Sequence, residues 1–392
     1  MLFSKLLVTS MASVAMGQGL TQMLADHPSL SNLTTYLNLY PDILSNLRSL
    51  SNITLLAPSN MAFQTALNSS AGAMFSAGDA DMITAIFSYH VLNGSYSNFN
   101  TTPEFFNTHL MPGMYANVTG GQVVEAISSS NMSNATVTFY SGLLQNASVT
   151  ANGTFNFTGG VVHIVDDFLQ IPSNLTNTAV QFNLRSAVGA LTAANLAEET
   201  DTMMDMTFFV PNNAAFQAVG TTLATSSPQD LSRILRYHLV NGTISYSRDL
   251  KNGSTLVTAD GLPVTITREE GDLYVNSARV VTPDVLVANG VMHIIDGVLN
   301  PANQTVSAQP TASTGEPAFS DASSASSAPF TSGVPSATTS VDTARPTGSA
   351  SISESGSGMG SSSSSSAGAM PLKTGAIGAV ALFGGAAGLM NL

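Results

Sequence analysis

Apolar residues follow helical spacing early in two segments of this chain and alternate with polar residues later in each. The helical spacing predicts helices with a break at Pro41, through Leu30, Leu33, Leu37, Ile43, Leu47 and Leu50 in the first segment and Leu184, Val188 and Leu191 in the second. A short apolar run then stops at Pro58 and at Pro211, because proline cannot continue a β-ladder. We expect Asn60 and Asn213 to cap the helices that follow.

The later part of each segment predicts strands. Residues 264–268 and 273–275 flank a turn containing Gly271 and are typical of a hairpin, and residues 123–127 and 136–140 are the counterparts in the first segment. Both segments therefore have helices first and strands later, which favours an α+β fold.

A predicted helix in each segment carries a histidine on its apolar stripe. The stripes are Ile83, Ile86, Phe87 and His90 in the first segment and Leu231, Ile234, Leu235 and His238 in the second. Gly94 and Gly242 follow, and we expect them to lie just past the helix ends.

Three motifs occur twice, in the same order. LLAPSNMAF (55–63), FSYHVLNGS (87–95) and GGVVHIVDDFL (159–169) are matched by FFVPNNAAF (208–216), LRYHLVNGT (235–243) and NGVMHIIDGVL (289–299). Matching residues of the first motif are 153 positions apart, whereas solenoid units run roughly 20–50 residues. We therefore expect two complete domains, module 1 at 18–170 and module 2 at 171–302.

The repeated residues invite a catalytic or metal-binding interpretation, which the pattern does not favour. Buried structural histidines are the more common finding at such positions, and the motif residues concerned are Tyr89, His90, His163, Asp166, Tyr237, His238, His293 and Asp296. The spacing of the histidines is not that of a zinc helix, and the chain has no cysteine, so no thiolate site or disulfide exists. No nucleophile elbow, phosphate loop or dinucleotide motif occurs. We expect neither a catalytic site nor a metal or other cofactor.

The two ends of the chain resemble targeting signals. Residues 1–17 combine one lysine, an apolar run and small residues, which is typical of a secretory signal peptide. Residues 371–392 follow a serine tract and end in a small, apolar tail, which favours a removed GPI-anchor signal over a terminal membrane helix. The attachment residue is expected within 363–368, with Ser366 as the candidate. Residues 303–370 are rich in Ser, Thr, Ala and Pro and are expected to form a disordered, O-glycosylated stalk.

The net charge and the glycosylation sequons indicate which classes of partner and what kind of surface to expect. Only 9% of residues are charged and the formal net charge is −13, which argues against a nucleic-acid partner. We expect glycans to supply the soluble surface instead. The fifteen N-glycosylation sequons begin at Asn32, Asn52, Asn68, Asn93, Asn100, Asn117, Asn131, Asn134, Asn146, Asn152, Asn156, Asn174, Asn241, Asn252 and Asn303.

Taken together, the three motifs resemble the fasciclin-like domain, twice over, across about residues 20–301. The resemblance implies two tandem modules, each a β-wedge of about seven strands packed with several helices. It also implies cell adhesion or matrix contact on secreted or lipid-anchored proteins, and the Ser-rich stalk and anchor signal resemble those of fungal proteins. In the family, the Tyr-His region is linked to receptor binding as well as to folding, which points to Tyr89, His90, Tyr237 and His238. A sequon follows each of these pairs, at Asn93 and Asn241, and a glycan there would shield the adjacent surface.

The leading hypothesis is a non-enzymatic, GPI-anchored glycoprotein of the plasma membrane or cell wall that displays two adhesion modules on a stalk. Its partners would be cell-surface, wall or matrix proteins or glycans, with membrane contact through the lipid anchor. A carrier for a small hydrophobic or carbohydrate ligand is the alternative, and an enzyme acting on wall polymers is a third, less favoured one.

Overall fold

The computed structural model describes residues 18–68, 78–130, 135–304, 308, 318–319 and 322–343. The predicted signal peptide, Asn131, Asn134, the end of the stalk, Ser366 and the anchor signal lie outside these residues.

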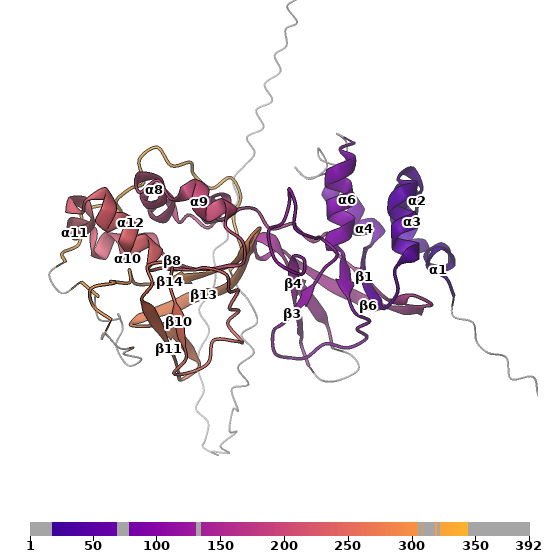
Figure 1. Cartoon of the computed structure of the whole chain (residues 1–392). Helices are drawn as coiled ribbons and strands as arrows, with labels where there is room; N and C mark the ends of the chain where they lie inside the picture. The colour runs from indigo at the N-terminus through magenta and orange to yellow at the C-terminus, as the bar shows by residue number, and fades with distance from the viewer. Residues whose placement is uncertain are drawn as a thin grey trace, which may run out of the picture. The chain divides into compact units, whose positions relative to one another are not determined.

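Module 1 places its helices before most of its strands (Figure 1). Its helices are α1 (Leu20–Asp26), η1 (Pro28–Leu30), α2 (Ser31–Leu39), α3 (Pro41–Ser49), α4 (Asn60–Leu67), α6 (Ala80–Tyr89) and η2 (Gly142–Leu144). Its strands are β1 (Ile53–Pro58), β2 (Val91–Asn93), β3 (Glu104–Asn107), β4 (Val123–Ser128), β5 (Val137–Tyr140), β6 (Asn146–Phe157) and β7 (Gly160–Val165).

Module 2 repeats this order. Its helices are α7 (Leu175–Gln181), α8 (Arg185–Ala193), α9 (Ala197–Thr202), α10 (Asn213–Ala218), α11 (Gly220–Thr225) and α12 (Pro228–Arg236). Its strands are β8 (Met206–Pro211), β9 (Leu239–Val240), β10 (Thr255–Val257), β11 (Pro263–Glu269), β12 (Asp272–Val275), β13 (Ala278–Val287) and β14 (Gly290–Ile295).

Each module contains one seven-stranded sheet, as the resemblance implied. The strand orders are β2-β1-β7-β6-β5-β4-β3 and β10-β11-β12-β13-β14-β8-β9. One pair in each sheet is parallel, β1 with β7 and β8 with β14, and these strands pair with their other neighbours in antiparallel fashion. All residues of β1, β8 and β14 are buried, because apolar groups pack on both faces of these strands.

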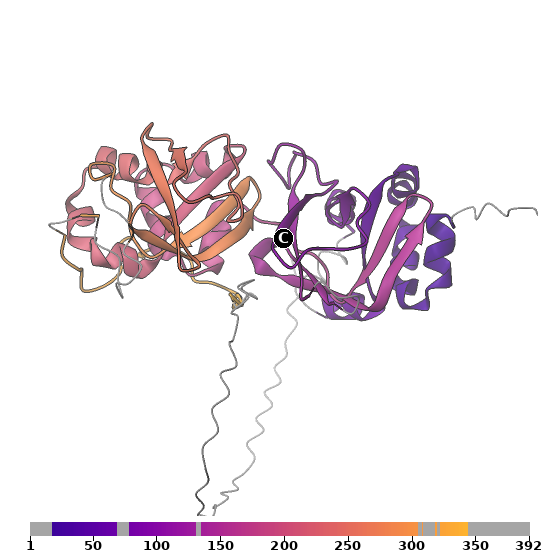
Figure 2. The same cartoon turned by 90° about the horizontal axis from the view of Figure 1, so that it is seen from below.

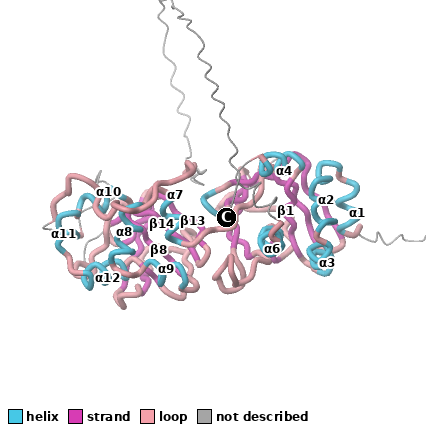
Figure 3. The backbone as a smooth tube through the Cα atoms, turned by 90° about the horizontal axis from the view of Figure 1, so that it is seen from above, coloured by secondary structure: helices cyan, strands magenta, loops and turns pink. Residues whose placement is uncertain are grey.

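The helices cover one face of each sheet. Seen from above, α8, α10 and α12 lie over β8 and β14 (Figure 3), while the view from below shows the strands (Figure 2). In module 1, alternate residues of β1 enter different cores, since Leu55 packs with the helices and Leu56 packs with the strands β4 to β6. Phe208 and Phe209 of β8 divide in the same way.

The predicted break at Pro41 is confirmed, since α2 ends at Leu39 and Pro41 begins α3. The predicted caps are wrong by one residue, because Ser59 and Asn212 cap α4 and α10 through their side-chain oxygens. Asn60 instead lies in the first turn of α4, where its side chain bonds another helix.

The expected positions of two glycines relative to the helices are also wrong. Helix α6 ends at Tyr89, and strand β2 follows before Gly94, which has φ 111°. In module 2, β9 likewise separates α12 from Gly242. These glycines end short strands, because the chain enters the sheet directly after each helix.

Part of the segment expected to form an unpacked stalk lies on module 2. Residues 322–343 form neither helix nor strand, yet Phe319, Ala322, Phe330 and Val334 pack against the helical core of that module. Within the described residues, the packed chain therefore extends well past residue 303.

Candidate functional site

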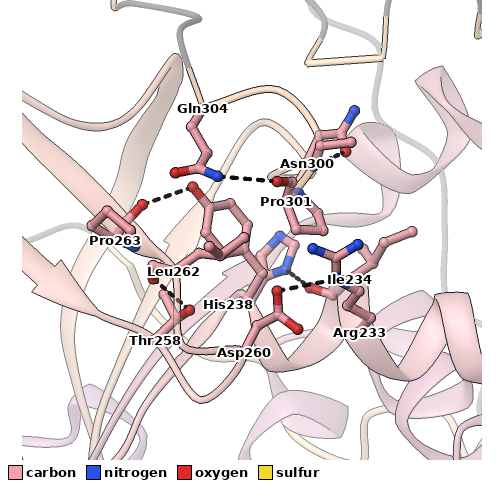
Figure 4. Close-up of polar contacts among 12 residues, drawn as sticks. Arg233, Ile234, His238, Thr258, Asp260, Leu262, Pro263, Asn300, Pro301 and Gln304 are labelled. Carbon is pink, nitrogen blue, oxygen red and sulfur yellow. Dashed lines mark hydrogen bonds and ion pairs between the residues drawn. The ribbon is translucent and has the colours of Figure 1, made fainter.

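His90 and His238 join the end of a helix to the segment that follows the last strand of the same module. The carbonyls of Ile86 and Ile234 lie 2.8 Å from Nδ1 of His90 and His238, respectively. The amide nitrogens of Leu169 and Leu299 donate to Nε2 of the same two rings, at 2.9 Å. Because Nε2 accepts a hydrogen bond, the proton of each neutral ring is on Nδ1, which donates to the helix. Figure 4 shows this contact between His238 and Ile234.

Both rings are almost completely buried, with 0% and 3% exposure. Burial lowers the pKa of His90 and of His238 to about 4, because the charged imidazolium loses its hydration there. Each ring is therefore neutral near pH 7 and has both nitrogens bonded to backbone. This arrangement holds a fold together and leaves no ring nitrogen for a metal ion or a substrate.

The tyrosines that precede these histidines form hydrogen bonds to strands of the same module. Tyr89 donates its hydroxyl to the carbonyl of Val123, at 2.8 Å, and Tyr237 donates to the carbonyl of Pro263, at 2.9 Å. Both tyrosines are 0% exposed. Burial raises the pKa of Tyr89 and of Tyr237, since the phenolate is poorly solvated. The Tyr-His pair therefore ties one helix to two other parts of its module.

His163 and His293 lie in β7 and β14 and are also buried. Nε2 of His163 donates to the carbonyl of Tyr96, at 2.8 Å, and Nε2 of His293 donates to that of Ser245, at 2.9 Å. Nδ1 of His163 lies 2.9 Å from the hydroxyl of Thr154. Burial lowers the pKa of His163.

Asp166 and Asp296 close the ends of the strands that carry these histidines. Oδ1 of Asp166 accepts from the amide of Ser148, at 2.6 Å, and Oδ1 of Asp296 accepts from that of Arg279, at 2.8 Å. In return, the backbone amide of Asp166 donates to the carbonyl of Ser148, and that of Asp296 donates to the carbonyl of Arg279, both at 3.0 Å. The carboxylates thus extend the ladder by one pair of bonds.

The eight motif residues do not converge on one cleft in either module. Within the described residues, no group of three or more His, Asp or Glu side chains is placed to hold a metal ion. Hydrogen bonds to the protein itself occupy the motif side chains, so the geometry supports a structural role for them.

Two further repeated residues, missed from the sequence, belong to the same bonding scheme. Thr54 donates its hydroxyl to the carbonyl of Gly94 and accepts from the amide of Tyr96, both at 2.8 Å. Thr207 makes the equivalent bonds to Thr243, at 2.7 Å, and Ser245, at 2.8 Å. The signal available was their position immediately before the first motif, at the second residue of a buried strand, where a hydroxyl requires a partner.

Asn60 and Asn213 cross-link helices rather than capping them. Oδ1 of Asn60 accepts from the amide of Asn32, at 2.9 Å, and Oδ1 of Asn213 accepts from that of Ser186, at 3.0 Å. Because these bonds are equivalent, α2 of module 1 is the counterpart of α8 of module 2, and Asn32 corresponds to Ser186.

The sequon asparagines differ in accessibility. Among the sequon asparagines that the structure describes, nine are exposed, namely Asn52, Asn68, Asn93, Asn100, Asn146, Asn152, Asn156, Asn241 and Asn252. Asn32, Asn117, Asn174 and Asn303 are half-buried. Seven of the nine exposed sequons thus lie in module 1, and glycosylation of any of them stays a prediction.

A family model matches this chain over both modules. It is described as the fasciclin domain and matches residues 28–172 and 182–301. The chain belongs to the fasciclin-domain family. Its α+β fold, with one seven-stranded sheet and several helices in each of two tandem fasciclin domains, is the one that the resemblance implied.

Two relatives match most of this chain and most of their own length. A fasciclin-like arabinogalactan protein of Arthroderma benhamiae is 35% identical over 341 residues, which cover 86% of this chain and 80% of the relative. A second, from Phaeosphaeria nodorum, is 29% identical over 75% of this chain and 92% of its own length. A solved FAS1 domain pair from the insect cell adhesion molecule fasciclin I is 19% identical, with a TM-score of 0.33, and the match covers 71% of this chain and 99% of that chain.

Among the described residues, no helix has both the length and the apolar character needed to cross a membrane.

Proposed function

We propose that this protein is a non-enzymatic cell-surface glycoprotein that presents two fasciclin domains for adhesion to wall, matrix or cell-surface proteins or glycans. The observation that carries the proposal is the bonding of the repeated histidines. In both modules their ring nitrogens are bonded within the module. The repeated motifs therefore serve the fold, and contact with partners is left to the outer surface.

The order of the segments along the chain is consistent with display of the two domains at the cell surface. A signal peptide, two domains, a Ser/Thr-rich segment and an anchor signal would place the domains outside the cell, attached to the plasma membrane or the wall by lipid. Support comes from the names of the relatives, which are fasciclin-like arabinogalactan proteins.

A detachment assay tests the adhesive role. Cells would display the full chain, chains lacking 18–170 or 171–302, or the segment from 303 onward alone, and the shear needed to detach them from wall- or matrix-coated surfaces would be measured. We expect the full chain to resist most, because two linked modules gain from effective concentration. Equal resistance from the segment alone would contradict an adhesive role for the domains, and phospholipase release would test the anchor separately.

Carbohydrate binding is a second candidate, favoured by a cavity in module 1. The cavity is about 890 Å³ and is lined mainly by polar residues, among them Ser97, Asn98, Ser128, Thr154 and His163. This lining suits a sugar better than a hydrophobic ligand. Sequon residues Asn100 and Asn152 also line it. Native mass spectrometry after enzymatic deglycosylation would show a bound oligosaccharide, and a bare protein mass would count against this role.

A further inference from the structure

The described residues 318–319 and 322–339, here called the strap, run across the helices of module 2. At its start, the side-chain amide of Asn300 donates to the carbonyl of Ala318, at 2.9 Å, and that of Asn303 donates to the same carbonyl, at 3.3 Å. The strap therefore begins beside the last residues of its own module.

Hydrogen bonds to the backbone of the strap fix its middle part to α10 and α11. The amide of Ala325 donates to the carbonyl of Gln217, at 2.9 Å, and the side chain of Gln217 donates back to the carbonyl of Ala325, at 3.2 Å. The hydroxyl of Thr221 donates to the carbonyl of Ser323, at 2.8 Å, and accepts from its amide, at 3.0 Å. Hydrogen bonds to the main chain of an extended peptide supply affinity, while pockets for its side chains supply specificity.

Helices α7 and α8 hold the later part. The guanidinium of Arg185 donates to the carbonyls of Thr331 and Val334, at 2.9 and 2.7 Å. Further along the strap, Oε1 of Gln181 lies 2.9–3.3 Å from the amide nitrogens and hydroxyls of Thr338 and Thr339, which donate to it.

Phe330 is the apolar anchor of the strap. Its ring packs against the module 2 core and meets Phe216 edge to face, with ring centroids 6.4 Å apart. Phe330 has φ 60°, which is uncommon for a bulky residue and persists only where the surroundings require it.

Two glycines make room for the strap. A Cβ on Gly189, in the middle of α8, would lie 1.8 Å from the carbonyl oxygen of Phe330, and one on Gly220 would lie 2.5 Å from Cβ of Ala325. Glycine inside a helix costs about 0.5–1 kcal/mol relative to alanine. The close approach of the strap accounts for this unfavourable residue in α8.

From this geometry we propose that the helical face of module 2 is a docking groove for an extended peptide, and that the strap of the same chain is its resident ligand. The groove recognises backbone carbonyls through the side chains of Arg185 and Gln217, backbone amides through the side chain of Gln181 and the main-chain carbonyl of Gln217, and one aromatic ring beside Phe216. The occupant is assigned in cis because Asn300 and Asn303 already hold its first residue. This inference does not depend on the adhesive role.

A peptide-binding experiment tests the groove directly. In the full chain, residues 318–339 are replaced by a Gly/Ser sequence of equal length, and a labelled synthetic peptide of residues 318–341 is titrated by fluorescence anisotropy. We expect saturable binding to the replaced chain and at least about tenfold weaker binding to the wild-type chain, whose groove is filled. A peptide with Phe330→Ala should bind the replaced chain about tenfold less tightly, since the aromatic contact is lost.

No binding to a replaced chain whose module 2 remains folded would overturn the proposal. A wild-type dimer that becomes monomeric on replacement would overturn the assignment in cis, because the strap would then be exchanged between copies. If the replaced chain does not fold, Gly189→Thr in the otherwise intact chain provides a second test. Hydrogen exchange at the Ala325 amide should accelerate in this variant, and unchanged protection there would also overturn the proposal. Thr35→Gly, at the corresponding position of module 1, is the matched control and should leave that amide protected.

Discussion

The two modules differ most at the helical face that carries the strap in module 2. With α2 aligned on α8 through the Asn60 and Asn213 bonds, Thr35 and Tyr36 of module 1 stand where module 2 has Gly189 and Ala190. The ring of Tyr36 packs on Phe63, with centroids 5.2 Å apart. Module 1 thus fills with its own side chain the place that Phe330 occupies in module 2.

The second glycine shows the same contrast. Leu67 stands where module 2 has Gly220, and the sequon residue Asn68 stands where it has Thr221. Leu67 is 45% exposed, and neighbouring Met61 is 72% exposed. Module 1 therefore has side chains, and a glycan acceptor, on the face that module 2 covers with backbone.

The interiors of the modules, by contrast, share most of their motif hydrogen bonds. The histidine, tyrosine, threonine and aspartate contacts recur with almost the same distances. Buried polar groups need particular partners, whereas a surface position tolerates many side chains. The duplicated interior thus keeps one fold, and the helical surface is free to acquire different contacts.

The strongest test of the matching interiors removes the buried histidine of each module in turn. His90→Ala or His238→Ala leaves the buried amide of Leu169 or Leu299 without its acceptor, removes the bond from the ring to the helix carbonyl and opens a cavity. We expect each to destabilise its own module by about 3–5 kcal/mol. Calorimetry of the full chain would show this as one lowered transition, and a single variant that lowers both transitions equally would contradict independent modules.

Acid should affect the two modules alike. The pKa of His90 and His238 is about 4 in the folded state and about 6.5 in the unfolded chain. Because the unfolded state binds a proton first, the stability present above pH 6.5 is lost as pH falls toward about 4, on the order of 3 kcal/mol per module. Histidine NMR titration of the folded protein checks the cause, and midpoints near 6.5 for these two rings would contradict it.

Exchanging the residue types at Gly189 of α8 and Thr35 of α2 tests the difference between the helical faces of the two modules. Gly189→Thr should expel the strap and destabilise module 2 by about 2 kcal/mol, because the lost apolar and hydrogen-bonded contacts exceed the gain in helix propensity. Thr35→Gly should cost module 1 about 1 kcal/mol, chiefly through helix propensity and the loss of the bond from its hydroxyl to the Ser31 carbonyl. Urea unfolding measures both, and equal effects would remove the contrast between the modules.

Glycan mapping sharpens the contrast with no expected change in stability. All five of Ser323, Ser324, Ser326, Thr338 and Thr339 are exposed, but the hydroxyls of Ser323, Thr338 and Thr339 are hydrogen-bonded to module 2. We expect O-glycans at Ser324 and Ser326 and not at the three bonded residues, since a sugar there would displace the strap. Electron-transfer mass spectrometry of the secreted protein would show this, and full occupancy at Thr338 and Thr339 would contradict a seated strap.

Much of the fold was predictable because local patterns and the repeat agree. The break at Pro41 follows from proline chemistry, and the burial of His90 and His238 follows from their place on apolar stripes. The cap was misplaced because Ser59 and Asn60 are both capping residue types, and only the path of the chain decides which one is outside the helix. Gly94 was misplaced because a three-residue strand between a helix and a glycine has no periodicity to reveal it.

The sequence by itself determined the number of modules, the buried stripes and the internal role of the repeated histidines, since these depend on spacing and on the cost of burying polar groups. The tertiary structure alone decided which backbone groups those histidines bond, and it alone showed the strap. A Ser/Ala/Pro-rich segment has no apolar period, so its composition predicts disorder. Its docking depends instead on backbone bonds, one phenylalanine and two distant glycines, which only the folded module brings together.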